Sequence, residues 1–298
     1  MSLVNRLIAH ALPAIPRPII GHFSRRYIAG PTLDDAVKVV RALNQSGVMA
    51  TVDVLGEHLT RIAEADLALD SYLQLLDRIA EEGLDSNISV KLTALGLQVD
   101  EAVCLRHMQR LCTAAREHRN FVRIDMEDSS CTAATLEIHR ALRRDFQNVG
   151  VVIQAYLRRS RADVQALAAD RANVRLCKGI YVEPRAIAFR DREIVRQNFV
   201  DLLGILLGGG SYVGIATHDE ILTWHAMRLT SELGLPREAF EFQMLLGVDD
   251  VLRRILVEAG YRLRVYVPFG AHWYEYSMRR LKENPDIVGH ILRGAFRG

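Results

Sequence analysis

The amino-acid sequence predicts a closed parallel (β/α)₈ barrel, a TIM-type fold of class α/β, with a short helical lead-in at the N-terminus. Eight short apolar segments rich in β-branched residues recur along the chain, and longer stretches with helical spacing lie between them. This alternation predicts parallel strands joined by helices. The length of 298 residues suits one barrel, and no Pro/Gly/Ser-rich linker divides the chain. An open doubly wound sheet is the alternative.

The candidate strands follow one another at regular intervals. We expect residues 1–45 to form a helical segment packed on the barrel, and residues 46–298 to form the barrel itself. The strands are VMATVDVLGE (48–57), NISVKLTAL (87–95), FVRIDMED (121–128), GVVIQAYL (150–157), NVRLCKGIY (173–181), YVGIATHD (212–219), FEFQMLLG (240–247) and LRVYVPFG (263–270).

The segments between the strands have helical spacing. They include EADLALDSYLQLLDRIAEEG (64–83), VDEAVCLRHMQRLCTAAREH (99–118) and THDEILTWHAMRLTSELG (217–234). The third begins with Thr217 and Asp219 as candidate N-caps and ends at Gly234. A last helix, HWYEYSMRRLKENPD (272–286), follows the eighth strand and ends where Pro285 forbids its continuation.

The N-terminal segment carries no acidic residue before residue 34 but contains several arginines. Such a segment fits either a helical lead-in or contact with a membrane surface. Three prolines within residues 13–18 break any long amphipathic helix, so the lead-in is the favoured interpretation.

Composition and charge exclude several classes of protein. A net charge of +2 is too small to predict a nucleic-acid partner. The four cysteines form no CxxC pair and have no histidine at zinc-finger spacing, which predicts reduced thiols in a cytoplasmic protein without a metal site. The glycines of GILLGGGSYVG (204–214) precede a strand, so they do not form a dinucleotide-binding fingerprint.

Polar residues collect at the carboxyl ends of the predicted strands, where barrels carry their chemistry. Isolated buried charges are costly, so this coincidence predicts a polar ligand in the barrel mouth. The residues are Glu57, Lys91, Asp125, Glu127, Gln154, Arg175, Lys178, Thr217, His218, Asp219, Gln243 and Tyr266.

Each of these residues also has a purely structural interpretation. Lys91 could pair with Asp125 as an interior salt bridge, and Lys178 could pair with Glu57 or Glu183. His218 could serve only to cap the next helix, and Tyr266 could pack in the barrel with its hydroxyl satisfied.

Two adjacent arginines stand out in the last predicted helix. Arg279 and Arg280 follow Tyr276 by one turn and precede Glu283 by one turn, so the four side chains can share a polar patch. The patch is either a solvated helix face or a binding site for a small carboxylate, which guanidinium groups bind bidentately.

The remaining donors suit a cofactor that stores charge. Gln154, Arg175, Lys178 and the amides around Gly179 fit an electron-rich ring or phosphates better than an acyl-transfer site. The sequence has no nucleophile elbow, P-loop or HExxH motif.

Ordered motifs from about residue 48 to residue 286 resemble those of proline dehydrogenase in its monofunctional bacterial form. Each single motif is weak, and the ordered set is highly specific. The motifs are VKLTALG, RIDMED, VVIQAYLRRS, VRLCKGIY, ATHD, FEFQMLLG, RVYVPFG and YSMRRLKENP.

The resemblance implies a (β/α)₈ barrel that holds non-covalent FAD and oxidises L-proline to Δ1-pyrroline-5-carboxylate by hydride transfer to flavin N5. It implies that electrons pass to a quinone in the membrane, and that a pyrroline-5-carboxylate dehydrogenase uses the product. The protein is then cytoplasmic, with peripheral contact at the inner face of the membrane as an open alternative.

The resemblance also assigns roles at the substrate. Arg279 and Arg280 grip the proline carboxylate beside Lys91, and Asp125 orients this clamp. The proline ring packs against Leu245, Tyr266 and Tyr276, and Glu283 binds one of the two arginines. The bulk of Tyr266 favours proline over hydroxyproline. The catalytic set implied is Lys91, Asp125, Tyr266, Arg279 and Arg280.

On the flavin side, the resemblance places Gln154 and Arg175 at the isoalloxazine ring. Contacts to the ring or the phosphate-ribose arm are implied for Lys178, Gly179, Thr217 and His218. Glu57 resembles a gate residue that pairs with Arg175 when the pocket is empty. Val182 and Glu183 stand where fused members carry an aromatic residue, a departure at the adenine end.

Two other functions remain open. One is a lyase or aldolase barrel in which Lys91 or Lys178 forms a Schiff base. The other is a binding protein for small carboxylates that has no catalytic activity.

Overall fold

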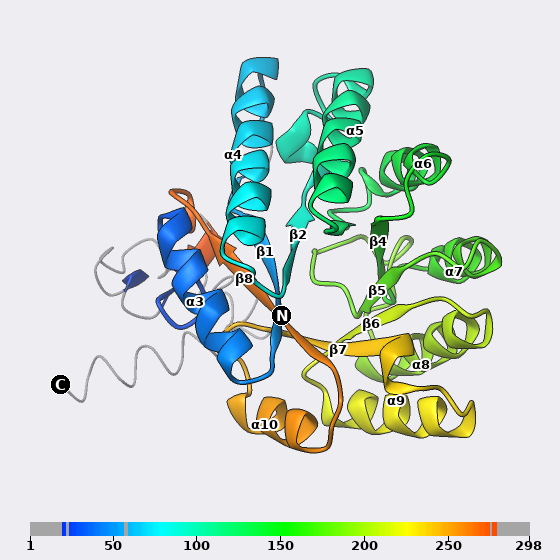
Figure 1. Cartoon of the computed structure of the whole chain (residues 1–298). Helices are drawn as coiled ribbons and strands as arrows, with labels where there is room; N and C mark the ends of the chain where they lie inside the picture. Colours follow the sequence, from blue (N-terminus) through cyan, green and yellow to red (C-terminus); the bar gives the residue numbers. More distant parts are fainter. Residues whose placement is uncertain (1–19, 22–23, 57–58, 275, 279–298) are drawn as a thin grey trace.

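The computed structural model describes residues 20–21, 24–56, 59–274 and 276–278 of the chain. Eight strands form a closed barrel in the order β1-β2-β3-β4-β5-β6-β7-β8 (Figure 1). All eight neighbouring pairs, including β1 with β8, are parallel. The predicted (β/α)₈ barrel is confirmed.

Each predicted strand segment overlaps one observed strand, but all eight strands are shorter than predicted, and β2 and β4 begin one residue earlier. The residues beyond the strand ends form the loops that carry many of the polar side chains. The strands are β1 (Met49–Val54), β2 (Ser86–Val90), β3 (Val122–Ile124), β4 (Val149–Gln154), β5 (Val174–Cys177), β6 (Val213–Ala216), β7 (Phe240–Leu245) and β8 (Leu263–Phe269).

Helices surround the barrel, and a large apolar core lies between them and the strands. The α-helices are α3 (Leu33–Gln45), α4 (Ile62–Glu81), α5 (Glu101–Glu117), α6 (Thr132–Leu142), α7 (Ser160–Ala169), α8 (Arg192–Gly208), α9 (Glu220–Glu232) and α10 (Asp250–Glu258). Two 3₁₀ turns, η2 (Leu92–Leu95) and η3 (Arg237–Ala239), complete the described elements. Within the described ranges, no helix is both long and apolar enough to cross a membrane.

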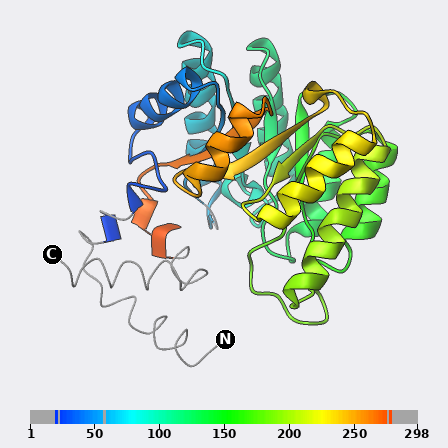
Figure 2. The same ribbon diagram turned by 90° about the horizontal axis from the view of Figure 1, so that it is seen from below.

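Helix α3 takes the place beside β8 and β1 where a barrel would otherwise carry its eighth helix (Figure 1). It begins with a capping box, in which the side chains of Thr32 and Asp35 each accept a backbone hydrogen bond from the other residue. The segment after β8 is therefore not needed to cover the outside of the barrel. Figure 2 shows its start, residues 273–274 and 276–278, on the lower side of the barrel.

The cap predicted for α9 is only partly correct. Asp219 is the N-cap residue by position, but its carboxylate makes no capping hydrogen bond. The hydroxyl of Thr217 instead accepts from the amide of Asp219 at 3.0 Å. The Asp219 carboxylate is thereby left for partners at the barrel mouth.

The interior of the barrel is polar. Alternate residues of a barrel strand face inwards, and on several strands the inward positions carry charged or amide side chains. Buried examples are Asp53 on β1, Arg123 on β3, Arg175 on β5 and Glu241 on β7. Because buried charges need partners, Asp53, Arg175 and Glu241 each form an ion pair, and Arg123 donates hydrogen bonds to oxygens of Val151 and Asn173.

Candidate active site

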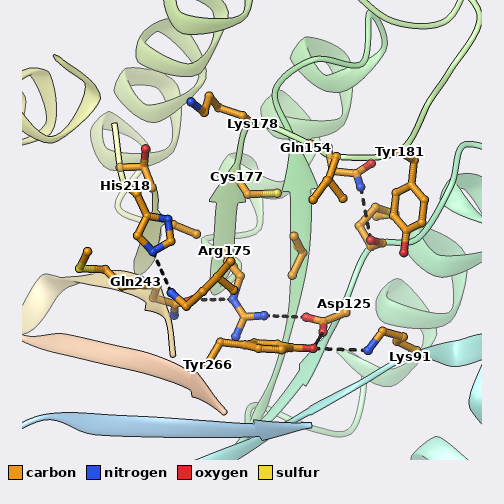
Figure 3. Close-up of a pocket in the computed structure, with 18 of the residues that line it drawn as sticks. Lys91, Asp125, Gln154, Arg175, Cys177, Lys178, Tyr181, His218, Gln243 and Tyr266 are labelled. Carbon is orange, nitrogen blue, oxygen red and sulfur yellow. Dashed lines mark hydrogen bonds and ion pairs between the residues drawn. The ribbon is translucent and has the colours of Figure 1, made fainter. Parts of the chain in front are cut away.

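A cavity of about 260 Å³ lies at the carboxyl ends of the strands (Figure 3). Side chains from β4 to β8, and from the segments that follow β2, β3, β5, β6 and β8, surround it. The structure brings these predicted site residues together around the cavity: Lys91, Asp125, Gln154, Arg175, Lys178, Gly179, Thr217, His218, Leu245, Tyr266 and Tyr276. Gln243, Met126, Cys177 and Tyr181 line it as well.

Lys91 pairs with Asp53, not with Asp125. Its Nζ lies 2.5 Å from the Asp53 carboxylate, which is fully buried. Asp53 was not among the site residues predicted from the sequence. The signal was an acidic residue inside the apolar strand segment ATVDV, where a lone carboxylate needs a buried partner.

The ion pair keeps the Lys91 ammonium protonated. Burial by itself would lower the pKa of Lys91, but the charges of Asp53 and Asp125 outweigh burial and raise this pKa. A lysine nucleophile must be unprotonated to form a Schiff base. This environment therefore disfavours the lyase or aldolase alternative at Lys91.

The hydroxyl of Tyr266 joins two ion pairs. Its oxygen lies 2.7 Å from the Asp53 carboxylate and 3.0 Å from the Asp125 carboxylate. The ammonium of Lys91 donates to the same oxygen at 3.3 Å. The phenol ring is thus fixed at the cavity wall by polar contacts at its far end.

Arg175 forms the second ion pair. Its Nη1 donates to Asp125 at 2.6 Å and to the Ser89 hydroxyl at 3.0 Å, and its Nε donates to the Gln243 side-chain oxygen (Figure 3). The guanidinium carbon lies 5.5 Å from the centre of the Tyr266 ring. Asp125 therefore contacts both Arg175 and Tyr266.

At the mouth of the cavity, Lys178 pairs with Asp219 at 3.0 Å, and Arg196 holds the same carboxylate at 2.9 Å. The structural alternative in which Lys178 pairs with Glu183 is wrong. Glu183 instead accepts from the amide and hydroxyl of Ser129 at 2.7 and 2.6 Å, and so ties the loop after β5 to the loop after β3.

His218 links two strand ends. Its Nε2 accepts from the backbone amide of Leu245 at 3.0 Å, so this ring nitrogen carries no proton. The side chain is thus fixed beside the cavity by β7 and does not cap α9.

Gly179 permits a close approach of backbone to side chain. Its φ is +101°, and an added Cβ would lie 2.1 Å from the Tyr156 ring. Only glycine fits at this position, because any side chain would collide with the Tyr156 ring. The missing side chain lets the loop after β5 bring its backbone to the cavity edge.

The remaining predicted site residues fall outside the described part of the chain. They are Glu57, Arg279, Arg280 and Glu283. Tyr276, one turn before the arginine pair in sequence, lines the cavity. The described residues contain no group of three or more His, Cys, Asp or Glu side chains that could hold a metal ion.

Comparison with known proteins identifies the family. The sequence profile of the proline dehydrogenase family matches residues 36–291. Proline dehydrogenase 1 of Bacillus subtilis subsp. natto is 40% identical over 271 residues, which cover 91% of this chain and 90% of that protein. The chain belongs to the proline dehydrogenase family. A second member, the proline dehydrogenase of Deinococcus radiodurans, is 34% identical over 95% of this chain and 93% of its own length.

Solved structures place this member of the proline dehydrogenase family on a known fold. Proline utilization A from Bdellovibrio bacteriovorus, crystallised after inactivation by N-propargylglycine, superimposes with a TM-score of 0.83 and 28% identity. The match covers 88% of this chain but 33% of that protein. This chain thus spans about a third of the longer relative, in the part that forms the barrel.

Proposed function

We propose that this chain catalyses the FAD-dependent oxidation of L-proline to Δ1-pyrroline-5-carboxylate, the first step of proline degradation. Membership of the proline dehydrogenase family carries the assignment. The cavity supports it, because ionised groups and tyrosine rings surround a space in the barrel mouth, where barrel enzymes bind their substrates.

The residues present fit a flavin. Within the described residues, the buried Oε1 of Gln154 and the buried Nη2 of Arg175 have no hydrogen-bond partner. Both side chains line the cavity, and unpartnered buried polar atoms are costly unless a ligand satisfies them. Lys178, Thr217 and His218 supply further polar groups at the rim.

Bound FAD would supply the acceptor for the two electrons and the hydrogen removed from the substrate. We propose that Gln154 and Arg175 bind at its ring. We further propose that Lys178, Thr217, His218 and the backbone at Gly179 bind near the ring or along the phosphate-ribose arm. The positive charge of Arg175 would stabilise negative charge that develops on a bound group.

On the substrate side, Lys91 offers a fixed positive charge for the proline carboxylate. Tyr266, Tyr276 and Leu245 line the wall on which the ring would pack. We propose that Arg279 and Arg280 complete the clamp, since they follow Tyr276 by one helical turn in sequence, and that Glu283 holds one of them. Fixing the carboxylate orients the ring carbon that reacts, an effect worth roughly 7–11 kcal/mol at most.

Asp125 acts as a positioning residue in this proposal. It holds Arg175 at 2.6 Å and the Tyr266 hydroxyl at 3.0 Å. The Asp125 carboxylate thus fixes Arg175, which is proposed to bind the cofactor, relative to Tyr266, which is proposed to contact the substrate. The gate formed by Glu57 and Arg175 stays a prediction, and in the structure the Arg175 guanidinium is held by Asp125, Ser89 and Gln243.

The visible spectrum of the purified protein tests the proposal. We expect a yellow protein whose flavin absorbance bleaches when L-proline is added without oxygen. Prior treatment with N-propargylglycine, which inactivates the Bdellovibrio bacteriovorus relative, should abolish proline turnover. A colourless protein that forms a borohydride-trapped adduct with a carbonyl substrate would favour the lyase alternative. A flavin that binds but never bleaches with proline would favour a binding protein.

We also propose that a quinone takes the electrons, that a pyrroline-5-carboxylate dehydrogenase consumes the product, and that the enzyme works in the cytoplasm with peripheral contact to the membrane. Turnover of proline with a soluble quinone analogue tests the first point. Sedimentation with anionic lipid vesicles, with and without proline, tests the membrane contact.

A further inference from the structure

A chain of hydrogen bonds runs to the cavity from deeper in the barrel interior, away from the barrel mouth. It starts at Glu241, an almost fully buried carboxylate on β7. One oxygen, Oε1, accepts from Arg264 at 2.7 Å and from Nε2 of Gln243 at 2.6 Å. The other, Oε2, accepts from Arg264 at 3.1 Å and from the Tyr212 hydroxyl at 2.7 Å.

Glu241 decides which way the Gln243 amide points. A carboxylate only accepts hydrogen bonds, so the amide must turn its NH₂ group towards Glu241. The amide oxygen then faces away from Glu241 and accepts from Nε of Arg175. A reversed amide would place an NH₂ group against the Arg175 N–H, with two donors in contact.

The carboxylate stays ionised over the working pH range. Burial by itself would raise the pKa of Glu241, but the charge of Arg264, with hydrogen bonds from Arg264, Tyr212 and Gln243, outweighs burial and lowers it to about 2. The orientation of the Gln243 amide is therefore fixed wherever the protein is folded at neutral pH.

We propose that Glu241 is a positioning residue for Arg175. Acting through the Gln243 amide, it fixes the guanidinium in the place where Arg175 holds Asp125 and lies against the Tyr266 ring. Glu241 does not line the cavity, so its influence passes through Gln243. The consequence for catalysis rests on the proposed function, whereas the orientation of Arg175 does not.

Gly214 leaves the space that this arrangement needs. Gly214 lies on β6 opposite Glu241 in the strand register. A Cβ at this position would lie 2.4 Å from Nε2 of Gln243 and 2.8 Å from its amide carbon. Gly214→Ala therefore displaces the Gln243 amide while it leaves every charged group of the network in place.

Two variants disturb this arrangement, and two matched controls do not. Gly214→Ala moves the amide, and Glu241→Gln removes the charge that orients it. Tyr212→Phe removes one hydrogen bond from the far oxygen of Glu241 and leaves Gln243 and Arg175 unchanged. Gly204→Ala adds the same methyl group on α8, where no atom lies within 4 Å of it.

Each purified holoenzyme is assayed for kcat, KM and the midpoint potential of its flavin. We expect Gly214→Ala and Glu241→Gln to lower kcat roughly tenfold and to make the flavin potential more negative, because the positive charge of Arg175 is displaced. Tyr212→Phe and Gly204→Ala should stay within about twofold of the wild-type kcat. A crystal structure of Gly214→Ala should show the Arg175 guanidinium turned away from Asp125.

The proposal is overturned if Gly214→Ala folds and retains the wild-type kcat, flavin potential and Arg175 conformation. Gly214→Ala decides the matter if Glu241→Gln does not fold, since it removes no charge. If the wild-type protein neither holds FAD nor oxidises proline, the proposed function fails. The Arg175 conformation in the Gly214→Ala crystal structure then decides the positioning role alone.

Discussion

Lys91, which directly follows β2, and Asp53 on β1 form a buried ion pair with 2.5 Å between Nζ and Oδ2. The register of β1 and β2 sets Asp53 opposite Ser89. Lys91 lies two residues further along and therefore faces the same interior. Lys91 lines the cavity, whereas Asp53 lies deeper in the barrel interior. The ammonium is therefore held from the side that faces away from the cavity.

Asp53→Asn should destabilise the fold by roughly 3 kcal/mol, because it leaves the Lys91 charge buried without its partner. Urea unfolding followed by circular dichroism measures this loss. The control is Asp34→Asn, the same substitution at a surface ion pair in which Asp34 is exposed and Arg78 is half-buried; it should cost less than about 1 kcal/mol. Equal losses in the two variants would contradict the role assigned to Asp53.

His139 should make the fold sensitive to mild acid. Burial, and secondarily the charge of Arg123, lower the pKa of His139 from 6.5 to about 3. The unfolded chain therefore binds a proton below pH 6.5 that the folded protein does not bind, so stability falls as pH decreases from 6.5 towards 3.

At pH 5 this loss should amount to roughly 2 kcal/mol. The free energy of unfolding should fall between pH 7.5 and pH 5 in both proteins. The fall should be smaller in His139→Leu than in the wild type, by about this amount. An identical pH dependence in the two proteins would remove His139 as the cause.

Tyr266→Ser should raise the kcat/KM of hydroxyproline relative to that of proline, because the ring at the cavity wall is replaced by a small side chain. The hydroxyl contacts to Asp53 and Asp125 fix this ring. Tyr266→Phe keeps the bulk and loses these contacts, so it should lower activity without changing the preference. An unchanged ratio in Tyr266→Ser would exclude Tyr266 from substrate selection.

Gly179→Ala should reduce the FAD content of the purified protein, since its Cβ would overlap the Tyr156 ring and displace the loop after β5. We expect FAD to bind roughly 5- to 150-fold more weakly, from a strain of roughly 1–3 kcal/mol. Gly83→Ala is the control, with a φ of +61° and no atom within 4 Å of the added methyl group. Equal FAD occupancy in both variants would argue against a role of this loop in cofactor binding.

The pH dependence of kcat/KM should follow the substrate amine. No described side chain at the cavity is an evident general base for the amine: Lys91 is held protonated, and Asp125 is engaged by Arg175 and Tyr266. The enzyme then selects the neutral amine, and kcat/KM rises with pH. A flat profile across pH 6–9 would show that a group on the enzyme takes the proton.

The positions of the strands could be predicted from the sequence because their apolar segments are separated by long helical stretches. The strand ends could not. The segment NVRLCKGIY, for example, continues its apolar pattern past Cys177, where β5 ends. Lys178 and Gly179 therefore belong to a loop, and the loop is what brings them to the cavity edge.

The sequence by itself determined the barrel and most of the residues that meet at its mouth, because the alternation of apolar and helical segments fixes which ends of the strands coincide. Only the tertiary structure decided the pairing of the charges. From the sequence, Lys91 could form an ion pair with either Asp125 or Asp53. Lys178 could likewise pair with either Glu183 or Asp219, and the chemistry of the side chains does not favour one partner. The choice depends on strand register and on the angle at which each loop leaves the barrel, and both are set by packing between residues distant in sequence.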